Sequence, residues 1–81
     1  MSQITIRYFA AAAEAAGLEE ELWEAETLAQ LRGELTEKYG AAMSQVLRAG
    51  SFLVDGVVRK DDGPIGRSGL TVDVLPPFAG G

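Results

Sequence analysis

Residues 27–40, TLAQLRGELTEKYG, carry the strongest local signal in this sequence of 81 residues. Thr27 followed three positions later by Gln30 is the pattern of a capping box at a helix N-terminus. Apolar side chains then recur at helical spacing as one stripe, made of Leu28, Leu31, Leu35 and Tyr39. Because Gly40 stands where helices commonly end in a left-handed residue, the stretch predicts one main helix that packs on a core. Gly33 costs a helix about 1 kcal/mol relative to alanine, and close packing of the helix on a sheet would explain it.

Two strands and a short helix are expected before this helix. In residues 4–9, ITIRYF, alternate side chains face opposite sides, as in a strand with one buried face. The alanine-rich residues 11–17, AAAEAAG, predict a short helix closed by its final glycine. Residues 19–26, EEELWEAE, place two large apolar side chains among five glutamates. They predict a short strand near an edge of the sheet.

A helical turn, a hairpin and a last strand are expected after the main helix. Residues 41–50, AAMSQVLRAG, favour another helical turn with its apolar side chains facing inward. Residues 51–60, SFLVDGVVRK, predict a hairpin, because the central Asp-Gly pair is a favoured two-residue turn. Residues 61–69, DDGPIGRSG, form a loop that lacks the Gly-Lys-Ser/Thr pattern of phosphate-binding loops. Residues 70–75, LTVDVL, alternate as the final strand.

This order of elements predicts an α+β domain. The ubiquitin-like β-grasp suits the order best, with a mixed sheet, one main helix packed across it, and the first and last strands as central neighbours. The chain is long enough for one domain only. We expect the β-grasp domain to span residues 1–75 and residues 76–81 to form a projecting tail.

The acidic composition narrows the classes of partner. Seven basic and twelve acidic residues give a net charge of −5. Without a basic stripe, neither nucleic acid nor an anionic membrane is an expected partner. A basic protein partner is favoured, and charge that only keeps the domain soluble is the alternative. Because no apolar run could span a bilayer and MSQITIRYFA lacks the features of a signal peptide, we expect a cytoplasmic protein.

The lack of cysteine and histidine excludes most catalytic chemistry. The sequence contains neither residue, which removes thiol nucleophiles, disulfides, imidazole bases and the usual ligands of transition metals. We therefore expect no metal site. Any chemistry must use a carboxylate, an amine, a hydroxyl or a chain terminus.

The last residues, LPPFAGG, predict a tail that reaches a partner. Pro76 and Pro77 fix two φ angles and favour an extended conformation, so they project the chain away from the last strand. Phe78 then presents a large apolar side chain that is expected to dock on a partner. A frayed chain end without function is the alternative.

The end of the tail also supplies a reactive group. Ala79, Gly80 and Gly81 carry almost no side-chain bulk, so they can enter a narrow channel of another protein. The α-carboxylate of Gly81 is an anion at neutral pH and a poor electrophile. Once activated, for example as a mixed anhydride with AMP, it would offer an unhindered carbonyl carbon to a nucleophile.

With these features the sequence resembles the small sulfur-carrier proteins of the MoaD/ThiS type, and most closely the small subunit of molybdopterin synthase. The resemblance covers nearly the whole chain. It includes ITIRYFAAAAEAAG, TLAQLRGEL, VDG and above all GLTVDVLPPFAGG. The Pro-Pro-x-x-Gly-Gly ending after an apolar strand is its specific part.

The resemblance implies a β-grasp fold and a function that depends on two partner proteins, an activating enzyme and a large subunit. An E1-like adenylyltransferase would use ATP to adenylate Gly81, and sulfur transfer would then give a thiocarboxylate, with Gly80 as a slim neck. The tail would insert into the molybdopterin synthase large subunit and donate sulfur to cyclic pyranopterin monophosphate, in molybdenum cofactor biosynthesis. Two small subunits would flank a large-subunit dimer. The carrier would not be catalytic alone and would bind no cofactor stably.

Three apolar positions match residues that meet the large subunit in this family. They are Phe9, Val58 and Leu75, and the alternative is that each is an ordinary core or surface residue. Two positions depart from the family pattern outside the tail. Leu70 stands where an acidic residue is frequent, and Asp55 stands where the hairpin turn commonly has asparagine.

Other functions stay open on the sequence. Similar carriers supply sulfur for thiamine thiazole, for cysteine and for thiolated tRNA. A ubiquitin-like modifier would instead join Gly81 to lysines of target proteins. A plain interaction domain with an incidental tail is the remaining alternative.

Overall fold

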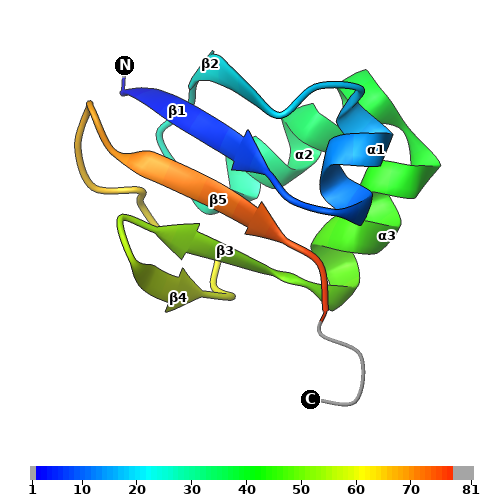
Figure 1. The fold of residues 1–81 in the computed structure, drawn as a ribbon. Coiled ribbons are helices and arrows are strands. Elements are labelled where there is room, and N and C mark those ends of the chain that lie inside the picture. Colours follow the sequence, from blue (N-terminus) through cyan, green and yellow to red (C-terminus); the bar gives the residue numbers. More distant parts are fainter. Residues whose placement is uncertain (1, 78–81) are drawn as a thin grey trace.

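The computed structural model describes residues 2–77, in which helices cover one face of a five-stranded sheet (Figure 1). In chain order the elements are β1 (Gln3–Tyr8), α1 (Ala11–Ala16), β2 (Glu20–Glu24), α2 (Leu28–Tyr39), α3 (Ala41–Ala49), β3 (Ser51–Val54), β4 (Val57–Arg59) and β5 (Thr71–Leu75). The strand order is β2-β1-β5-β3-β4. The predicted mixed sheet is therefore confirmed, with the first and last strands as neighbours at its centre.

The central strand pair is parallel and sets the position of the chain's last strand. β1 and β5 run parallel, with Ile6 opposite Val72. β2 pairs antiparallel with β1, and β3 pairs antiparallel with both β4 and β5. As predicted, β2 is an edge strand. The Asp-Gly turn of the hairpin is also confirmed, since Asp55 and Gly56 both have positive φ (49° and 88°).

One hydrophobic core lies between the sheet and the helices. The strands bury alternate residues on the helix side, namely Ile4, Ile6, Tyr8, Phe52, Val54, Val72 and Val74. The helices contribute Ala12, Leu28, Leu31, Leu35, Met43, Val46 and Leu47. The predicted stripe of the main helix thus faces the core, and Tyr39 packs at its margin, half-buried.

The capping box predicted at the start of α2 is confirmed, except that one of its two hydrogen bonds has a different donor. The Thr27 hydroxyl accepts a hydrogen bond from the backbone N–H of Gln30 at 3.0 Å. The Gln30 side chain reaches back to the N–H of Glu26 at 2.9 Å, and not to that of Thr27. The two bonds still occupy donors at the helix start that would otherwise lack partners.

Three local expectations need correction. Residues 41–50 form the nine-residue helix α3, and not a single turn. Gly40 joins α2 to α3 with φ 84° and ψ −157°, which is outside the left-handed helical region. Gly33 is exposed and a Cβ atom there would meet open space, so close packing does not explain this glycine.

A polar cluster fastens the edge strand β2 to α2. The hydroxyls of Tyr8 and Tyr39 both donate to Glu21 Oε2 at 2.5 Å, and Lys38 Nζ lies 3.2 Å from Glu21 Oε1. Burial alone would raise the pKa of the Glu21 carboxyl, but these hydrogen bonds outweigh it and lower the pKa. Burial and the Glu21 carboxylate raise the pKa of the Tyr8 hydroxyl.

Candidate functional site

The helices leave one face of the sheet uncovered, here called the open face (Figure 1). Toward β4 it carries the apolar residues Leu53 and Val58. The strand register places Asp73 opposite Leu53, and Leu53 opposite Val58. Val58 is 61% exposed and Leu53 is half-buried. The open face therefore presents apolar side chains of β3 and β4 side by side, next to the Asp73 carboxylate of β5.

A groove at the end of β5, here called the tail groove, brings together four of the predicted site residues. Its lining includes Val58, Leu75, Pro76 and Pro77, together with Lys60, and its volume is about 310 Å³. The register explains this meeting, because Leu75 lies opposite the first residue of β3 and β4 flanks β3. The chain thus leaves the sheet through an apolar groove.

Phe9 lines a different groove from Val58 and Leu75. It follows β1, and its backbone N–H donates to the Val74 carbonyl at 3.3 Å. Its ring lies under the Arg7 guanidinium, 5.2 Å from the ring centroid. Both residues line a second groove of about 660 Å³ beside β2. Phe9 directly follows Tyr8, whose register partner is Val74, so Phe9 and Leu75 lie at the same end of the central strand pair although they line different grooves.

An ion pair crosses the middle of the open face. Arg7 Nε lies 3.4 Å from Asp73 Oδ1, and the Asp73 side chain is only 15% exposed. Within residues 2–77 this carboxylate oxygen accepts no hydrogen bond, because the ion pair lacks hydrogen-bond geometry. A protein that covers the open face would bury Asp73 Oδ1, which can still accept a hydrogen bond. A partner that places a hydrogen-bond donor against this oxygen would therefore be favoured.

Gly50 fixes the base of the tail, and sequence reasoning missed it. A Cβ atom at this position would lie 2.0 Å from the Leu75 carbonyl oxygen and 2.8 Å from that of Val46. Only glycine allows the end of α3 to approach β5 this closely. The sequence showed only a glycine after a helical segment, which is too common a pattern to reveal the contact.

The remaining predicted site residues lie outside the described part of the chain. These are Phe78, Ala79, Gly80 and Gly81. Just before them, Pro76 is half-buried and Pro77 is exposed. Within residues 2–77, no group of three acidic side chains could hold a metal ion, and no helix has the length and apolar character to cross a membrane.

The five-stranded sheet with helices across one face is a ubiquitin-like β-grasp, the fold of a class of small proteins that includes the ThiS type. The chain belongs to the ThiS family, because a sequence model of that family matches residues 6–81. None of the curated sequences compared with the chain is a significant match.

Solved structures share the fold at low sequence identity. Small archaeal modifier protein 1 of Methanosarcina acetivorans is 22% identical, with a TM-score of 0.82 over 100% of this chain and 98% of that one. The protein of the same name from Haloferax volcanii is 21% identical, with a TM-score of 0.78 over 99% and 100% of the two chains. A chain in the complex of subunits 1 and 2 of the Helicobacter pylori molybdopterin-converting factor is 20% identical, with a TM-score of 0.72 over 98% and 99%.

Proposed function

We propose that this protein is the sulfur-carrier small subunit of molybdopterin synthase. Its Gly81 carboxylate would be loaded as a thiocarboxylate and would donate sulfur to cyclic pyranopterin monophosphate in molybdenum cofactor biosynthesis. The large subunit of the synthase would bind the open face and receive the tail. The likeness to a chain in a complex of subunits 1 and 2 of molybdopterin-converting factor supports this choice of partner.

The observation that carries the proposal is the composition of the tail groove. Val58 and Leu75 line the same groove as Pro76 and Pro77, at the point where the chain leaves the sheet. A partner that buries these apolar side chains therefore also receives the start of the tail. Docking of the domain would therefore also deliver Gly81 to the partner. The two prolines reduce the conformational entropy that the tail loses on insertion, because their φ angles are already fixed.

The chemistry at Gly81 requires activation by another protein. One carboxylate oxygen would attack the α-phosphorus of ATP in an E1-like adenylyltransferase, which forms the acyl adenylate and releases pyrophosphate. A sulfur nucleophile delivered by a donor protein would then displace AMP from the glycyl carbonyl carbon. If that nucleophile is the outer sulfur of a persulfide, the product is an acyl disulfide. A second thiol would then attack the donor's sulfur, so that the thiocarboxylate leaves and the donor and the thiol are joined in a disulfide. ATP is consumed by the partner, and the carrier supplies only the tail and its docking surface.

A C-terminal extension tests the proposal. The unmodified chain should acquire a thiocarboxylate when it is incubated with the activating enzyme, ATP and a sulfur donor. A chain with one alanine added after Gly81, or with Gly81 deleted, should not acquire it, while its circular dichroism spectrum and melting curve stay unchanged. Thiocarboxylate on the intact extended chain, verified by mass spectrometry to exclude trimming, would contradict the proposal.

A protein modifier is the second candidate function. The likeness to small archaeal modifier proteins, with TM-scores of 0.82 and 0.78, favours it as the alternative. In that case Gly81 would form amide bonds with lysines of other proteins. Denaturing purification of an N-terminally tagged chain from native cells separates the two functions. A modifier gives a ladder of covalent conjugates, whereas a sulfur carrier gives the free chain.

A further inference from the structure

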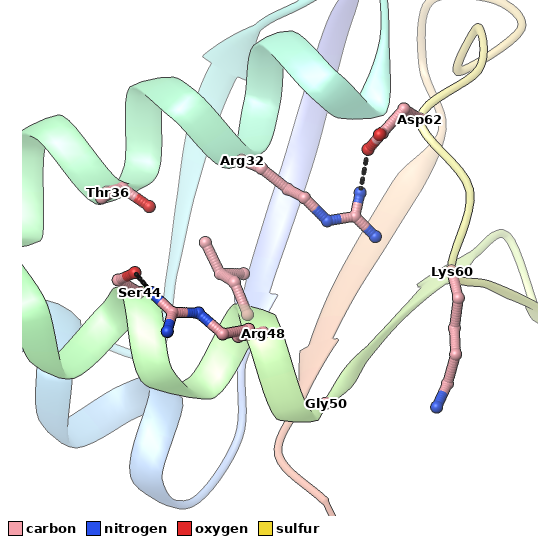
Figure 2. A pocket seen from close by; sticks show the side chains of 8 residues that line it. Arg32, Thr36, Ser44, Arg48, Gly50, Lys60 and Asp62 are labelled. Atoms are coloured by element: carbon pink, nitrogen blue, oxygen red, sulfur yellow. Dashed lines mark hydrogen bonds and ion pairs between the residues drawn. The ribbon is translucent and has the colours of Figure 1, made fainter.

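A concentration of basic side chains lies on the helix side of the molecule, in a pocket of about 390 Å³ (Figure 2). We call it the basic pocket, and its polar lining is made of Arg32, Thr36, Ser44, Arg48, Lys60 and Asp62. The first two come from α2, the next two from α3, and the last two from the segment after β4. Three of the seven basic residues of an acidic chain thus line one pocket, with one carboxylate among them.

Arg32 is held in a fixed orientation within this pocket. Its guanidinium lies 2.9 Å from Asp62 Oδ1, donates to the backbone carbonyl of Asp61 at 3.0 Å, and stacks 4.7 Å from the centroid of the Phe52 ring. The Asp61 carboxylate is engaged elsewhere, because Arg59 donates to both of its oxygens. These bonds hold the pKa of Asp61 well below its usual range. Asp62 is therefore the one carboxylate that offsets positive charge in the pocket.

Arg48 and Lys60 carry charges that the fold does not neutralise. Neither takes part in an ion pair with any residue from 2 to 77. Arg48 lies along its own helix and makes one long hydrogen bond, 3.4 Å, to the neutral hydroxyl of Ser44 (Figure 2). Both side chains are exposed. With Arg32 and Asp62, they leave the pocket with a net charge of about +2.

We propose that the basic pocket binds a phosphate-class oxyanion, either inorganic phosphate or the phosphate group of a nucleotide. A guanidinium offers two parallel donors that match phosphate oxygens, and an ammonium adds a compact charge. The hydroxyls of Ser44 and Thr36 supply neutral donors on the same wall. The net charge of −5 acts against anions at long range, so binding depends on contacts inside the pocket.

The basic pocket is connected to the tail groove through shared residues. Lys60 lines both. Gly50 also lines the basic pocket, and its backbone lies against the Leu75 carbonyl. The Lys60 side chain points away from Arg32 and Arg48 in Figure 2, so an anion that engages all three must draw it toward the pocket and would change the wall of the groove through which the tail leaves. This inference does not depend on sulfur transfer and stands or falls separately from it.

Titration with sodium phosphate tests the proposal. Backbone amide spectra of the full chain are followed by nuclear magnetic resonance at constant pH, with sodium chloride at matched ionic strength as the reference. We expect saturable shifts at Ser44, Arg48, Gly50 and Lys60 that chloride does not cause. A parallel titration with AMP identifies the source, since tighter binding of AMP assigns the site to a nucleotide and equal binding assigns it to phosphate itself.

Three variants make the titration specific. Arg48→Ala and Lys60→Ala should each weaken phosphate binding roughly tenfold, because each removes a charged donor. Arg67→Ala is the matched control, since Arg67 is exposed and also makes no ion pair within residues 2–77, but lies in the loop before β5 and outside the pocket. Shifts that stay linear, that chloride reproduces, or that persist in Arg48→Ala and Lys60→Ala would overturn the proposal.

Discussion

Gly50 packs against the carbonyl group of Leu75, so closely that a Cβ atom on Gly50 would lie 2.0 Å from the Leu75 oxygen. This contact joins the end of α3 to the last residue of β5. Leu75 is also the residue from which Pro76 and Pro77 continue the chain. The position at which the tail begins is therefore set by a backbone contact that no side chain at residue 50 would permit.

Replacement of Gly50 by alanine should displace the end of β5. The clash is with backbone atoms, which cannot rotate away as a side chain can. We expect Gly50→Ala to lower the free energy of unfolding by about 1–3 kcal/mol, which is measurable by urea denaturation. Amide shifts should concentrate at residues 50–51 and 75. A variant as stable as the wild type, with an unchanged spectrum, would show that the contact is looser than described.

The same substitution at Gly33 should have the opposite effect. Gly33 lies within α2, is exposed, and has no neighbour that a Cβ atom would touch. Alanine there should raise the free energy of unfolding by about 1 kcal/mol, because it restricts the unfolded chain and favours helix. Thermal melting of the two variants, Gly33→Ala and Gly50→Ala, checks that the first is more stable than the wild type and the second less stable. A loss of stability in Gly33→Ala would mean that this glycine has a packing role.

Val57 and Val58 provide a matched pair for the open face. They are neighbours on β4 and each is 61% exposed, but Val58 lines the tail groove whereas Val57 lies on the helix side. Val58→Arg should weaken binding to the molybdopterin synthase large subunit at least about tenfold, since the charge would have to be desolvated in the interface. Val57→Arg should bind nearly as the wild type does.

Isothermal titration calorimetry with the purified large subunit measures both affinities. The two substitutions add the same charge and alter the same strand, so a general effect on stability would appear in both. Equal losses for Val57→Arg and Val58→Arg would exclude the open face as the specific docking surface.

The Glu21 cluster predicts a dependence of stability on pH. The pKa of Glu21 is lower in the folded chain, so the native state binds fewer protons than the unfolded state near this pKa. The resulting stabilisation is complete above about pH 4.5 and is lost as the pH falls through the lowered value. The raised pKa of Tyr8 acts in the opposite direction, and its contribution is lost as the pH rises above 10.

Glu21→Gln should remove this part of the pH dependence. The variant loses a charged acceptor of three hydrogen bonds whose side chain is only 16% exposed. We expect a loss of about 2 kcal/mol at neutral pH and a flatter decline in stability on the acid side. Urea denaturation at a series of pH values measures both. Curves for wild type and variant that stay parallel below pH 4.5 would contradict the role given to Glu21.

Helices and turns were predictable from the sequence where interactions between residues close in the chain determine them. The capping residue Thr27, the stripe of three leucines and the Asp-Gly turn each act within a few residues, and the structure confirms all three. The full length of α3 is not evident from the sequence, because this helix is stabilised by packing against the rest of the fold. The environment of Gly33 is not evident either, since sequence does not show what a helix position faces.

The candidate site was only partly predictable. Val58 and Leu75 were expected at an interface, and the structure places them in one groove. Gly50 and Lys60 were not foreseen, because their roles arise from the meeting of α3, β5 and the segment after β4. No pattern within one of these segments encodes that meeting.

The most direct test of the proposed function is a single-turnover assay of sulfur transfer. The chain carrying a thiocarboxylate at Gly81 is mixed with purified large subunit and cyclic pyranopterin monophosphate, and molybdopterin and the mass of the chain are measured together. We predict that molybdopterin forms and that the chain returns to the carboxylate, whereas the unloaded chain yields none. Loaded chain that binds the large subunit yet keeps its sulfur, with no molybdopterin formed, would contradict the proposed function.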